Sequence, residues 1–415
     1  MIENNPLFDY IHREDPHFSF EILETKETED AHFYDIEFTS QEWKGILWKH
    51  RLALTIPRKS RYPEVAFLMI GADFPFYIEH SAIGNLYSEQ SGVACAFLYD
   101  IPNQPLFEDK VEDELIAYTL DQYLETGDAD WILLGPMTKS ALRAMDAVQK
   151  IHGIRAGWGI EKFVLNGASK RGWTTWLAAA ADRRIAGIAP QVFDNLNIEE
   201  QMPHQMKVFE NYSEMIADYT ERNLPEKMKT PRGKLLTAMV DPYSYREELT
   251  IPKVILNAVN DPYWATDASS FYFNALSGEN RMCFAPNCGH GYNDTDRLNG
   301  ALLGLIHSVG SGLEMPDLPE YDIEYGDGEV TLSIVTSAQA LEARVWVAES
   351  LSQDFRKSVW NEMKMIQDED EKLKYNFEFD LSKTANTAFF GEVVFAQEPF
   401  PFRITTKMFI SSLEV

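Results

Sequence analysis

The stretch EKFVLNGASKRGWTTW, residues 161–176, decides the fold. Its apolar run at 163–165 is typical of a buried strand, small residues follow as a tight turn, and residues 174–181 are compatible with a helix. Ser169 therefore lies where a strand becomes a helix. This is the geometry of a nucleophile elbow, in which a sharp turn exposes the serine oxygen above a sheet edge. Gly167 fits such a turn because the backbone must pass close to its neighbours there.

The turn departs from the common G-x-S-x-G pattern. Arg171 stands two residues after the serine, and the second glycine, Gly172, stands three after it. A lone Gly-x-Ser also occurs in ordinary connections. The assignment of Ser169 as a nucleophile therefore depends on partners elsewhere in the chain.

Buried strands alternate with helix-sized segments on both sides of this turn. Continuous apolar runs predict strands at residues 65–70, 93–99, 185–193, 253–259 and 281–285. Helices are expected at residues 78–90, 112–124, 138–151, 268–276 and 296–309. This alternation favours a doubly wound, mostly parallel sheet covered on both faces. Residues 17–56 alternate apolar and polar side chains, which predicts antiparallel strands that open the sheet.

Two regions interrupt this rhythm. Residues 196–250 are helical, charged and rich in Met and Tyr, and we interpret them as a lid inserted over the carboxyl edge of the sheet. The alternative is that residues 196–250 only pack against the rest of the domain and make no contact with substrate. Beyond them, short alternating strands without helices predict a C-terminal β-sandwich domain at residues 319–415, appended to an α/β domain at residues 1–318. Its strands are expected at residues 330–335, 343–347, 374–379, 393–395 and 402–410.

Composition limits the classes of partner. Of the 415 residues, 45% are hydrophobic, and Asp and Glu outnumber Lys and Arg by 65 to 37, which gives a net charge of -28. Such a field repels nucleic acid and anionic membranes. Apolar runs of about 18 residues, the length that spans a bilayer, do not occur, so we expect no transmembrane segment. The polar start of the chain predicts no signal peptide in this sequence.

The cysteines predict neither a disulfide framework nor a zinc site. Cys95, Cys283 and Cys288 are interpreted as small apolar side chains in strands or turns, although Cys283 and Cys288 are close enough in sequence to pair locally. None lies with histidines at zinc-ligand spacing. We expect no metal and no cofactor, and the sequence leaves the oligomeric state open.

Three residues occur in the order that a serine nucleophile requires. A serine hydroxyl needs a base within hydrogen-bond reach, and an acid must orient that base. In a hydrolase sheet these residues follow strands in the order Ser, acid, His. Ser169 follows one buried strand, Asp261 follows another 92 positions later, and His290 stands 29 further on between Gly289 and Gly291. We therefore predict Ser169, Asp261 and His290 as the catalytic residues.

Each partner has an alternative. His290 lies in a glycine-rich loop, where a histidine is often merely solvated. Asp267 suits the N-cap of the helix predicted from Ala268, and it is a weaker choice for the acid. Asp194, which ends the strand before residues 196–250, is another. Asp261 is preferred because it closes its strand immediately.

The remaining site residues are expected around this turn. Oxyanion donors are predicted at the backbone N–H of Lys170 and at Gly71 or Ala72, each worth roughly 3 kcal/mol in the transition state. Arg171 either grips an anionic substrate group or forms a structural salt bridge. Substrate contacts are expected from Arg171, Asp194, Trp264, Met206 and Phe209. Met and aromatic residues at these spacings also serve simply as helix packing.

Five segments carry a resemblance to a known family. They are GASKRGW around Ser169, IPNQPL at 101–106, the PMTK to AMDAVQ run at 136–149, NDPYW at 260–264 and PNCGH at 286–290. Together they resemble the PhoPQ-activated pathogenicity-related family, which includes a secreted autocrine proliferation repressor. The similarity is close over residues 5–310 and looser beyond. It implies an α/β-hydrolase fold, the catalytic roles named above, and an exported protein. The missing leader departs from that last point, so periplasmic or secreted and cytoplasmic locations both stay open.

The sequence thus predicts a serine hydrolase that cleaves an ester or related acyl bond through an acyl-enzyme. Its partner would be a small-molecule or peptide substrate. A dipeptidyl or prolyl-type serine peptidase is the alternative with the same catalytic residues. A secreted signalling or binding protein on a retained hydrolase fold is the alternative without catalysis.

Overall fold

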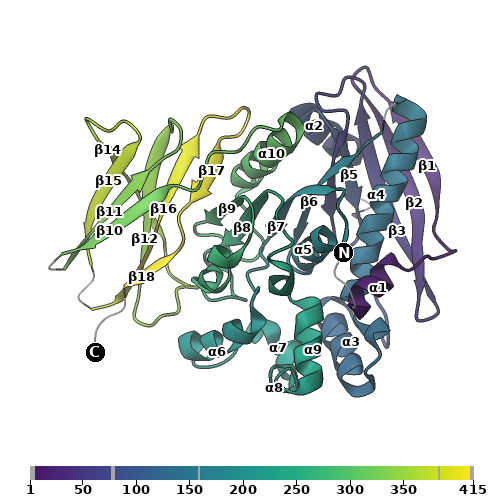
Figure 1. Ribbon diagram of the computed structural model, residues 1–415, viewed down its shortest axis with the longest axis horizontal. Helices are drawn as coiled ribbons and strands as arrows, with labels where there is room; N and C mark the ends of the chain where they lie inside the picture. The colour runs from purple at the N-terminus through teal and green to yellow at the C-terminus, as the bar shows by residue number, and fades with distance from the viewer. Residues whose placement is uncertain (1–4, 76–79, 158, 327, 382–383, 412–415) are drawn as a thin grey trace. The chain divides into compact units, whose positions relative to one another are not determined.

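The chain forms two compact units. The computed structural model describes residues 5–75, 80–157, 159–326, 328–381 and 384–411 (Figure 1). Unit 1 comprises Met1–Pro190, Ile216–Pro252 and Leu305–Leu313. Unit 2 comprises Gln191–Met215, Lys253–Gly304 and Glu314–Val415.

Unit 1 is built on a mixed sheet with the strand order β1-β2-β3-β5-β4-β6-β7. The strands β1, β2, β3 and β5 pair antiparallel, whereas β4 pairs parallel with both β5 and β6. This confirms the predicted antiparallel opening and the parallel strands that follow it. The strand bounds are β1 (Ser19–Glu27), β2 (Ala31–Trp43), β3 (Ile46–Pro57), β4 (Val65–Ile70), β5 (Ala94–Leu98), β6 (Lys162–Ala168) and β7 (Ile185–Gln191).

Helices cover both faces of this sheet. Successive side chains of a strand point to opposite faces, and on β3 His50 and Thr55 are an odd number of positions apart. Thr55 lies against Gly84 of α2, whereas His50 binds Ser40, whose hydroxyl lies 2.9 Å from that of Ser140 on α4. The helices of unit 1 are α1 (Pro6–His12), α2 (His80–Ser91), α3 (Glu112–Thr126), η1 (Ala129–Trp131), α4 (Leu134–Ala156), α5 (Lys170–Ala181), α7 (Ala217–Thr220), α8 (Leu224–Lys227), α9 (Pro231–Val240) and η3 (Pro242–Tyr245).

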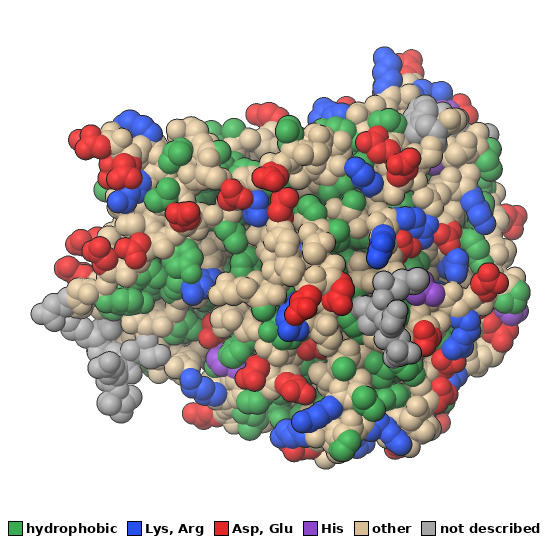
Figure 2. Space-filling view, in the orientation of Figure 1, with side chains coloured by type: hydrophobic (Ala, Val, Ile, Leu, Met, Phe, Trp, Pro, Cys, Tyr) green, Lys and Arg blue, Asp and Glu red, His purple; other side chains and the backbone are tan. Residues whose placement is uncertain are grey.

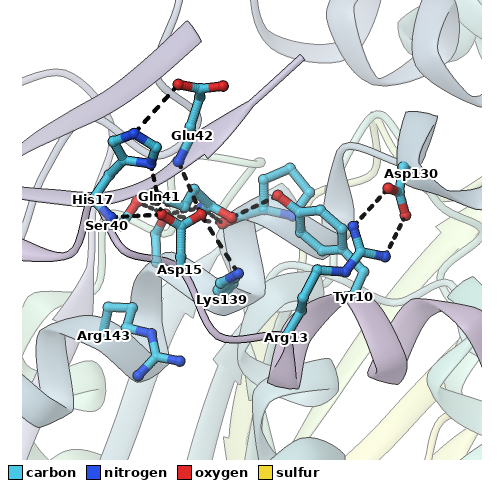
Figure 3. A network of polar contacts seen from close by, with 12 residues as sticks. Tyr10, Arg13, Asp15, His17, Ser40, Gln41, Glu42, Asp130, Lys139 and Arg143 are labelled. Atoms are coloured by element: carbon cyan, nitrogen blue, oxygen red, sulfur yellow. Dashed lines mark hydrogen bonds and ion pairs between the residues drawn. The ribbon is translucent and has the colours of Figure 1, made fainter. Parts of the chain in front are cut away.

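A polar network fastens α1 to β2 and α4 (Figure 3). The Tyr10 hydroxyl donates to Gln41 Oε1 at 2.7 Å, and Gln41 Nε2 donates to the Pro136 carbonyl at 2.8 Å. Lys139 of α4 lies 3.9 Å from Asp15, and burial lowers the pKa of its ammonium group to about 8. Buried polar groups that bind one another in this way favour a single arrangement of the helices they join.

Unit 2 continues the α/β pattern and adds the C-terminal strands. Its β8 (Lys253–Ala258) pairs parallel with β9 (Asn280–Ala285), and β9 pairs antiparallel with β17. From β17 the order is β17-β16-β12-β13, with β18 beside β16, and a second sheet has the order β10-β11-β15-β14. The ring of Phe379 on β15 packs 5.2 Å from that of Phe389 on β16, which is consistent with the predicted β-sandwich.

The remaining bounds of unit 2 are as follows. Its helices are α6 (Ile198–Phe209), η4 (Ala268–Phe271) and η5 (Phe273–Ala275), while η2 (Glu214–Ile216) and α10 (Thr295–Ser311) begin in unit 2 and end in unit 1. Its C-terminal strands are β10 (Glu320–Tyr325), β11 (Glu329–Val335), β12 (Glu342–Ser350), β13 (Asn361–Lys364), β14 (Ile366–Gln367), β15 (Lys374–Asp380), β16 (Asn386–Phe395), β17 (Phe402–Thr405) and β18 (Phe409–Ser411). The fold class is therefore the predicted one, mixed α/β with a largely parallel central sheet and an antiparallel C-terminal region.

Some element predictions were wrong. Residues 268–276 form the two short turns η4 and η5 rather than a helix, because Ser and Asn side chains compete for the backbone and the buried Tyr272 is tied to Asp194. The strand expected at 402–410 is two strands, β17 and β18. The first two residues of the helix expected at 78–90 lie outside the described residues, and α2 covers the rest.

The surface reflects the acidic composition. Figure 2 shows Asp and Glu side chains spread over the visible face, with Lys and Arg scattered between them. Within the described ranges, no helix is both long enough and apolar enough to cross a membrane.

Candidate active site

Ser169 lies at the turn between β6 and α5, with backbone angles φ 57 and ψ -125. A positive φ is rare for a residue with a side chain and costs about 1–3 kcal/mol, so the surrounding structure must hold it. Gly167 permits this turn, because a Cβ there would lie 2.5 Å from the Arg171 carbonyl oxygen. The strand β6, the sharp turn at Ser169 and the helix α5 have the strand-turn-helix order predicted from the sequence.

Two cations follow the serine directly and share one carboxylate. The side chains of Lys170 and Arg171 are both buried, at 7% exposure. Lys170 Nζ lies 2.6 Å from Glu112 Oε2, while Arg171 donates to both Glu112 oxygens, at 2.8 and 2.6 Å. Burial alone would raise the pKa of Glu112, but the hydrogen bonds and charge of Arg171, together with Lys170, lower it to about 2. Arg171 therefore forms the structural salt bridge, which was one of its two expected roles.

The loop after β4 carries the other predicted oxyanion residues. The N–H of Gly71 donates to the Leu98 carbonyl at 2.7 Å, so it is already engaged. The Ala72 carbonyl accepts from the N–H of Asp100 at 2.8 Å, and Asp100 Oδ1 in turn accepts from the N–H of Phe74 at 3.0 Å. Of the two predicted donors on this loop, Ala72 is the better choice. Lys170 is the first residue of α5, and the first N–H groups of a helix lack an intrahelical acceptor.

In unit 2, Asp261 and His290 form a close pair. Asp261 is 4% exposed, and its Oδ2 lies 2.7 Å from His290 Nδ1. Its Oδ1 accepts from the N–H of Tyr263 at 2.9 Å, and the Tyr263 ring lies 4.2 Å from the imidazole. Because a carboxylate oxygen accepts, Nδ1 carries the proton of this hydrogen bond, and in the neutral imidazole Nε2 is the acceptor. A general base needs this tautomer.

The two alternative acids bind other groups. Asp194 Oδ1 accepts from the Tyr272 hydroxyl at 2.6 Å. Burial raises the pKa of Asp194 to about 7 despite that bond, with a further contribution from the charge of Asp261. Asp267 does not cap η4 with its side chain but lies 2.7 Å from His204 Nε2. Sequence reasoning missed this second Asp–His pair, because the residues are far apart in the chain and no motif marks His204.

The predicted lid does not belong to one unit. Residues 196–215 fall in unit 2, whereas residues 216–250 fall in unit 1. Within unit 2, Met206 is 43% exposed, and the guanidinium of Arg356 lies 3.6 Å from the centre of the Phe209 ring. Trp264 is buried, with its ring 6.3 Å from that of Phe193. Substrate contacts by Met206, Phe209 and Trp264 stay predictions.

Comparison with known proteins places the chain in a family. The family model described as PhoPQ-activated pathogenicity-related protein matches residues 7–356. The chain belongs to this family. Autocrine proliferation repressor protein A of Dictyostelium discoideum is 33% identical over 306 residues, which cover 70% of this chain. The match spans 62% of the length of that relative.

Solved structures show more distant likenesses. Acetyl xylan esterase 1 from Thermoanaerobacterium sp. JW/SL YS485 is 13% identical, with a TM-score of 0.48 over 72% of this chain and 91% of that one. A puromycin-hydrolysing peptidase of Mycobacterium tuberculosis is also 13% identical, with a TM-score of 0.45 over 68% of this chain and 40% of that one.

Proposed function

We propose that this protein is a serine hydrolase that cleaves a carboxylic ester or a related acyl bond. The observation that carries the proposal is the strained positive φ of Ser169 at the end of a buried strand, since such strain persists at sites of function. The Asp261–His290 pair, at 2.7 Å, supports it by supplying an oriented base.

In the proposed reaction, His290 Nε2 takes the proton of the Ser169 hydroxyl as Oγ attacks the carbonyl carbon of the substrate. The negative charge that develops on the carbonyl oxygen is stabilised by the backbone N–H of Lys170 and that of Ala72. The tetrahedral intermediate collapses, the bond to the alcohol breaks, and His290 returns the proton to the leaving oxygen. Water, activated by the same imidazole, then attacks the acyl-enzyme and releases the acid. The Asp261 carboxylate stabilises the imidazolium that forms and holds the ring in its orientation.

The substrate group near the elbow is expected to be uncharged. Lys170 and Arg171, the two cations that follow Ser169, are both bound to Glu112, and Arg171 also donates to the Ile101 carbonyl at 2.5 Å, so gripping an anionic group would require breaking these bonds. We assign the selection of the substrate's acyl chain to residues 196–250, in which Met206 and Phe209 would supply an apolar surface. We assign further substrate contacts to Trp264 and Asp194. A neutral ester or acetyl group fits these side chains better than a phosphate or carboxylate does.

A fluorophosphonate probe tests the proposal. Wild-type protein should be labelled at Ser169, the Ser169→Ala variant should not, and Ser19→Ala, which removes an exposed hydroxyl on β1, should be labelled like wild type. Short p-nitrophenyl esters assayed beside dipeptide p-nitroanilides separate the esterase from the peptidase. Equal labelling of wild type and Ser169→Ala would exclude the proposed nucleophile.

The name of the Dictyostelium relative favours a second candidate. A protein that represses proliferation by binding, without catalysis, needs no reactive serine. Export to the periplasm or the medium would accompany this role. Absence of labelling in wild type, together with recovery of the protein outside the cytoplasm, would favour the binding role over the enzyme.

A further inference from the structure

The segment that carries Asp261 is held from the C-terminal region. Asn260, directly before the acid, donates from Nδ2 to three backbone carbonyls of one loop, those of Phe355, Arg356 and Ser358, at 3.5, 3.2 and 2.8 Å. Three acceptors within four successive positions surround this one amide group. The position of Asn260, and with it that of Asp261, therefore depends on the loop at residues 354–360.

The segment that carries His290 is held by the same loop. The Asn287 amide pairs with the backbone of Trp360 in both directions, because Nδ2 donates to its carbonyl at 2.9 Å and Oδ1 accepts from its N–H at 2.8 Å. Asn287 has φ 56, so the side chain leaves the backbone from a tight turn. The N–H of Asn260 also donates to the Cys288 carbonyl at 3.1 Å, which joins the two segments directly.

A third contact comes from an arginine of this loop. Arg356 Nη1 donates to the Pro262 carbonyl at 3.1 Å, next to the acid. Asp354 holds the guanidinium at 2.9 and 2.7 Å, and the Phe209 ring lies beneath it. Asp354 and Phe209 therefore hold the guanidinium of Arg356 in the orientation in which it donates to the Pro262 carbonyl.

The loop itself is anchored in the C-terminal strands. Phe355 is fully buried, Trp360 is 2% exposed, and the Trp360 ring lies 5.4 Å from that of Phe390 on β16. Buried aromatic residues of this size are costly to move, since truncating one removes about 3–5 kcal/mol of stability. Buried aromatic side chains thus fix the loop at residues 354–360, and its backbone and Arg356 make the polar contacts to the segments that carry Asp261 and His290.

We propose that residues 354–360 position the acid and the base, and that Asn260, Asn287 and Arg356 are positioning residues for Asp261 and His290. This inference rests on the proposed function. The C-terminal region is then a working part of the hydrolase rather than an independent module. A base must be held within a few tenths of an ångström of its productive geometry, and a misplacement of about 1 Å can cost about 10²-fold in rate.

Asn287→Gly is the sharpest variant. Glycine adopts φ 56 without strain, so the substitution removes both bonds to Trp360 and leaves the turn intact. Asp109→Gly is the matched control, because Asp109 has φ 63 on an exposed turn of unit 1. Arg356→Lys keeps the charge but loses the planar fork, and it provides a second variant should Asn287→Gly fail to fold.

Two measurements are made on each folded variant. With p-nitrophenyl acetate, Asn287→Gly and Arg356→Lys should lower kcat about tenfold or more with KM nearly unchanged, while Asp109→Gly should match wild type. In protein with ¹⁵N-labelled histidine, the Nδ1 proton of His290, identified by its loss in His290→Asn, should exchange faster with solvent in both variants.

The outcomes separate the two proposals. If wild type does not label at Ser169, the proposed function fails, and the exchange rate at His290 alone still decides whether this loop holds the pair. Unchanged proton exchange would overturn the positioning role. The positioning role would also be overturned if the variants had a lower melting temperature but wild-type kcat and wild-type exchange of the His290 Nδ1 proton.

Discussion

Replacing Glu112 with glutamine should destabilise the elbow without changing its shape. Glutamine keeps the size of the side chain and one acceptor oxygen, but it removes the negative charge that Lys170 and Arg171 share at 2.6 Å. Asp113, 3.4 Å from Lys170 Nζ, would be left as the nearer carboxylate. A buried cation without an ion-pair partner is strongly unfavourable, so unfolding should become easier.

The depressed pKa of Glu112 allows the loss of stability in Glu112→Gln to be estimated. The difference between its ordinary value of 4.5 and about 2 corresponds to about 3.5 kcal/mol at about 1.4 kcal/mol per pH unit. The Glu112 side chain is 36% exposed, and solvent screening reduces this to roughly 1.5–2 kcal/mol. At roughly 2–4 °C per kcal/mol for a unit of this size, Tm should fall by roughly 5 °C.

The direction of the pKa shift of Glu112 predicts how the Tm difference between wild type and Glu112→Gln changes with pH. A carboxyl group whose folded pKa is depressed contributes its full stabilisation above the unfolded pKa, near 4.5, and loses it as pH falls towards about 2. The Tm difference between wild type and Glu112→Gln, measured by scanning calorimetry, should therefore be constant from about pH 8 to 5.5 and should shrink below about pH 4.5. Glu114→Gln in the same helical turn is the control, since Glu114 is half exposed and lies 4.0 Å from Lys110. Equal Tm for wild type and Glu112→Gln at pH 7, or a difference that grows on acidification, would refute the argument.

Three further predictions concern the site. Asp261→Asn should lower turnover of p-nitrophenyl acetate by up to about 10⁴-fold with the fold intact, and Asp194→Asn by far less; the reverse order would make Asp194 the acid. Because burial raises the pKa of Asp194 to about 7 from 3.8, wild type should lose stability as pH rises between these values, and Asp194→Asn should remove this loss in denaturant titrations at pH 4 and 8. Replacing Met206 and Phe209 with alanine should change relative rates across p-nitrophenyl esters of increasing chain length while Ser169 reacts normally with the fluorophosphonate; an equal loss on every ester with a lower Tm would indicate packing alone.

The sequence predicted those features that local patterns encode. Continuous apolar runs predicted β4, β6, β8 and β9, because a strand buried on both faces is apolar over most of its length and shows no alternation of polar and apolar residues. Small residues at the end of β6 predicted the sharp turn into α5, because a Cβ at Gly167 would lie too close to the Arg171 carbonyl. The pairing of Asp261 with His290 followed from chain order, since each residue lies within five positions of the end of its strand, β8 or β9.

Features that depend on distant partners were not predicted. The segment containing Glu112 was recognised as an acidic helix, but its pairing with Arg171, 59 positions away, has no local sign. The His204–Asp267 pair was hidden for the same reason, and Asp267 was instead assigned to a helix cap. The helix predicted at 268–276 failed because a buried hydrogen bond from Tyr272 to Asp194 outweighs weak helical propensity.

The motif asparagines show how a local signal can have a distant cause. NDPYW and PNCGH each carry an asparagine near the predicted catalytic residue, and sequence alone gives Asn260 and Asn287 no chemistry. Their amides bind backbone groups 73 to 98 positions away, in a loop whose own sequence carries no motif. An amide that binds backbone groups restricts the residue that bears it but leaves the identity of its partners free. The C-terminal strands can therefore vary in sequence while their backbone continues to support Asp261 and His290.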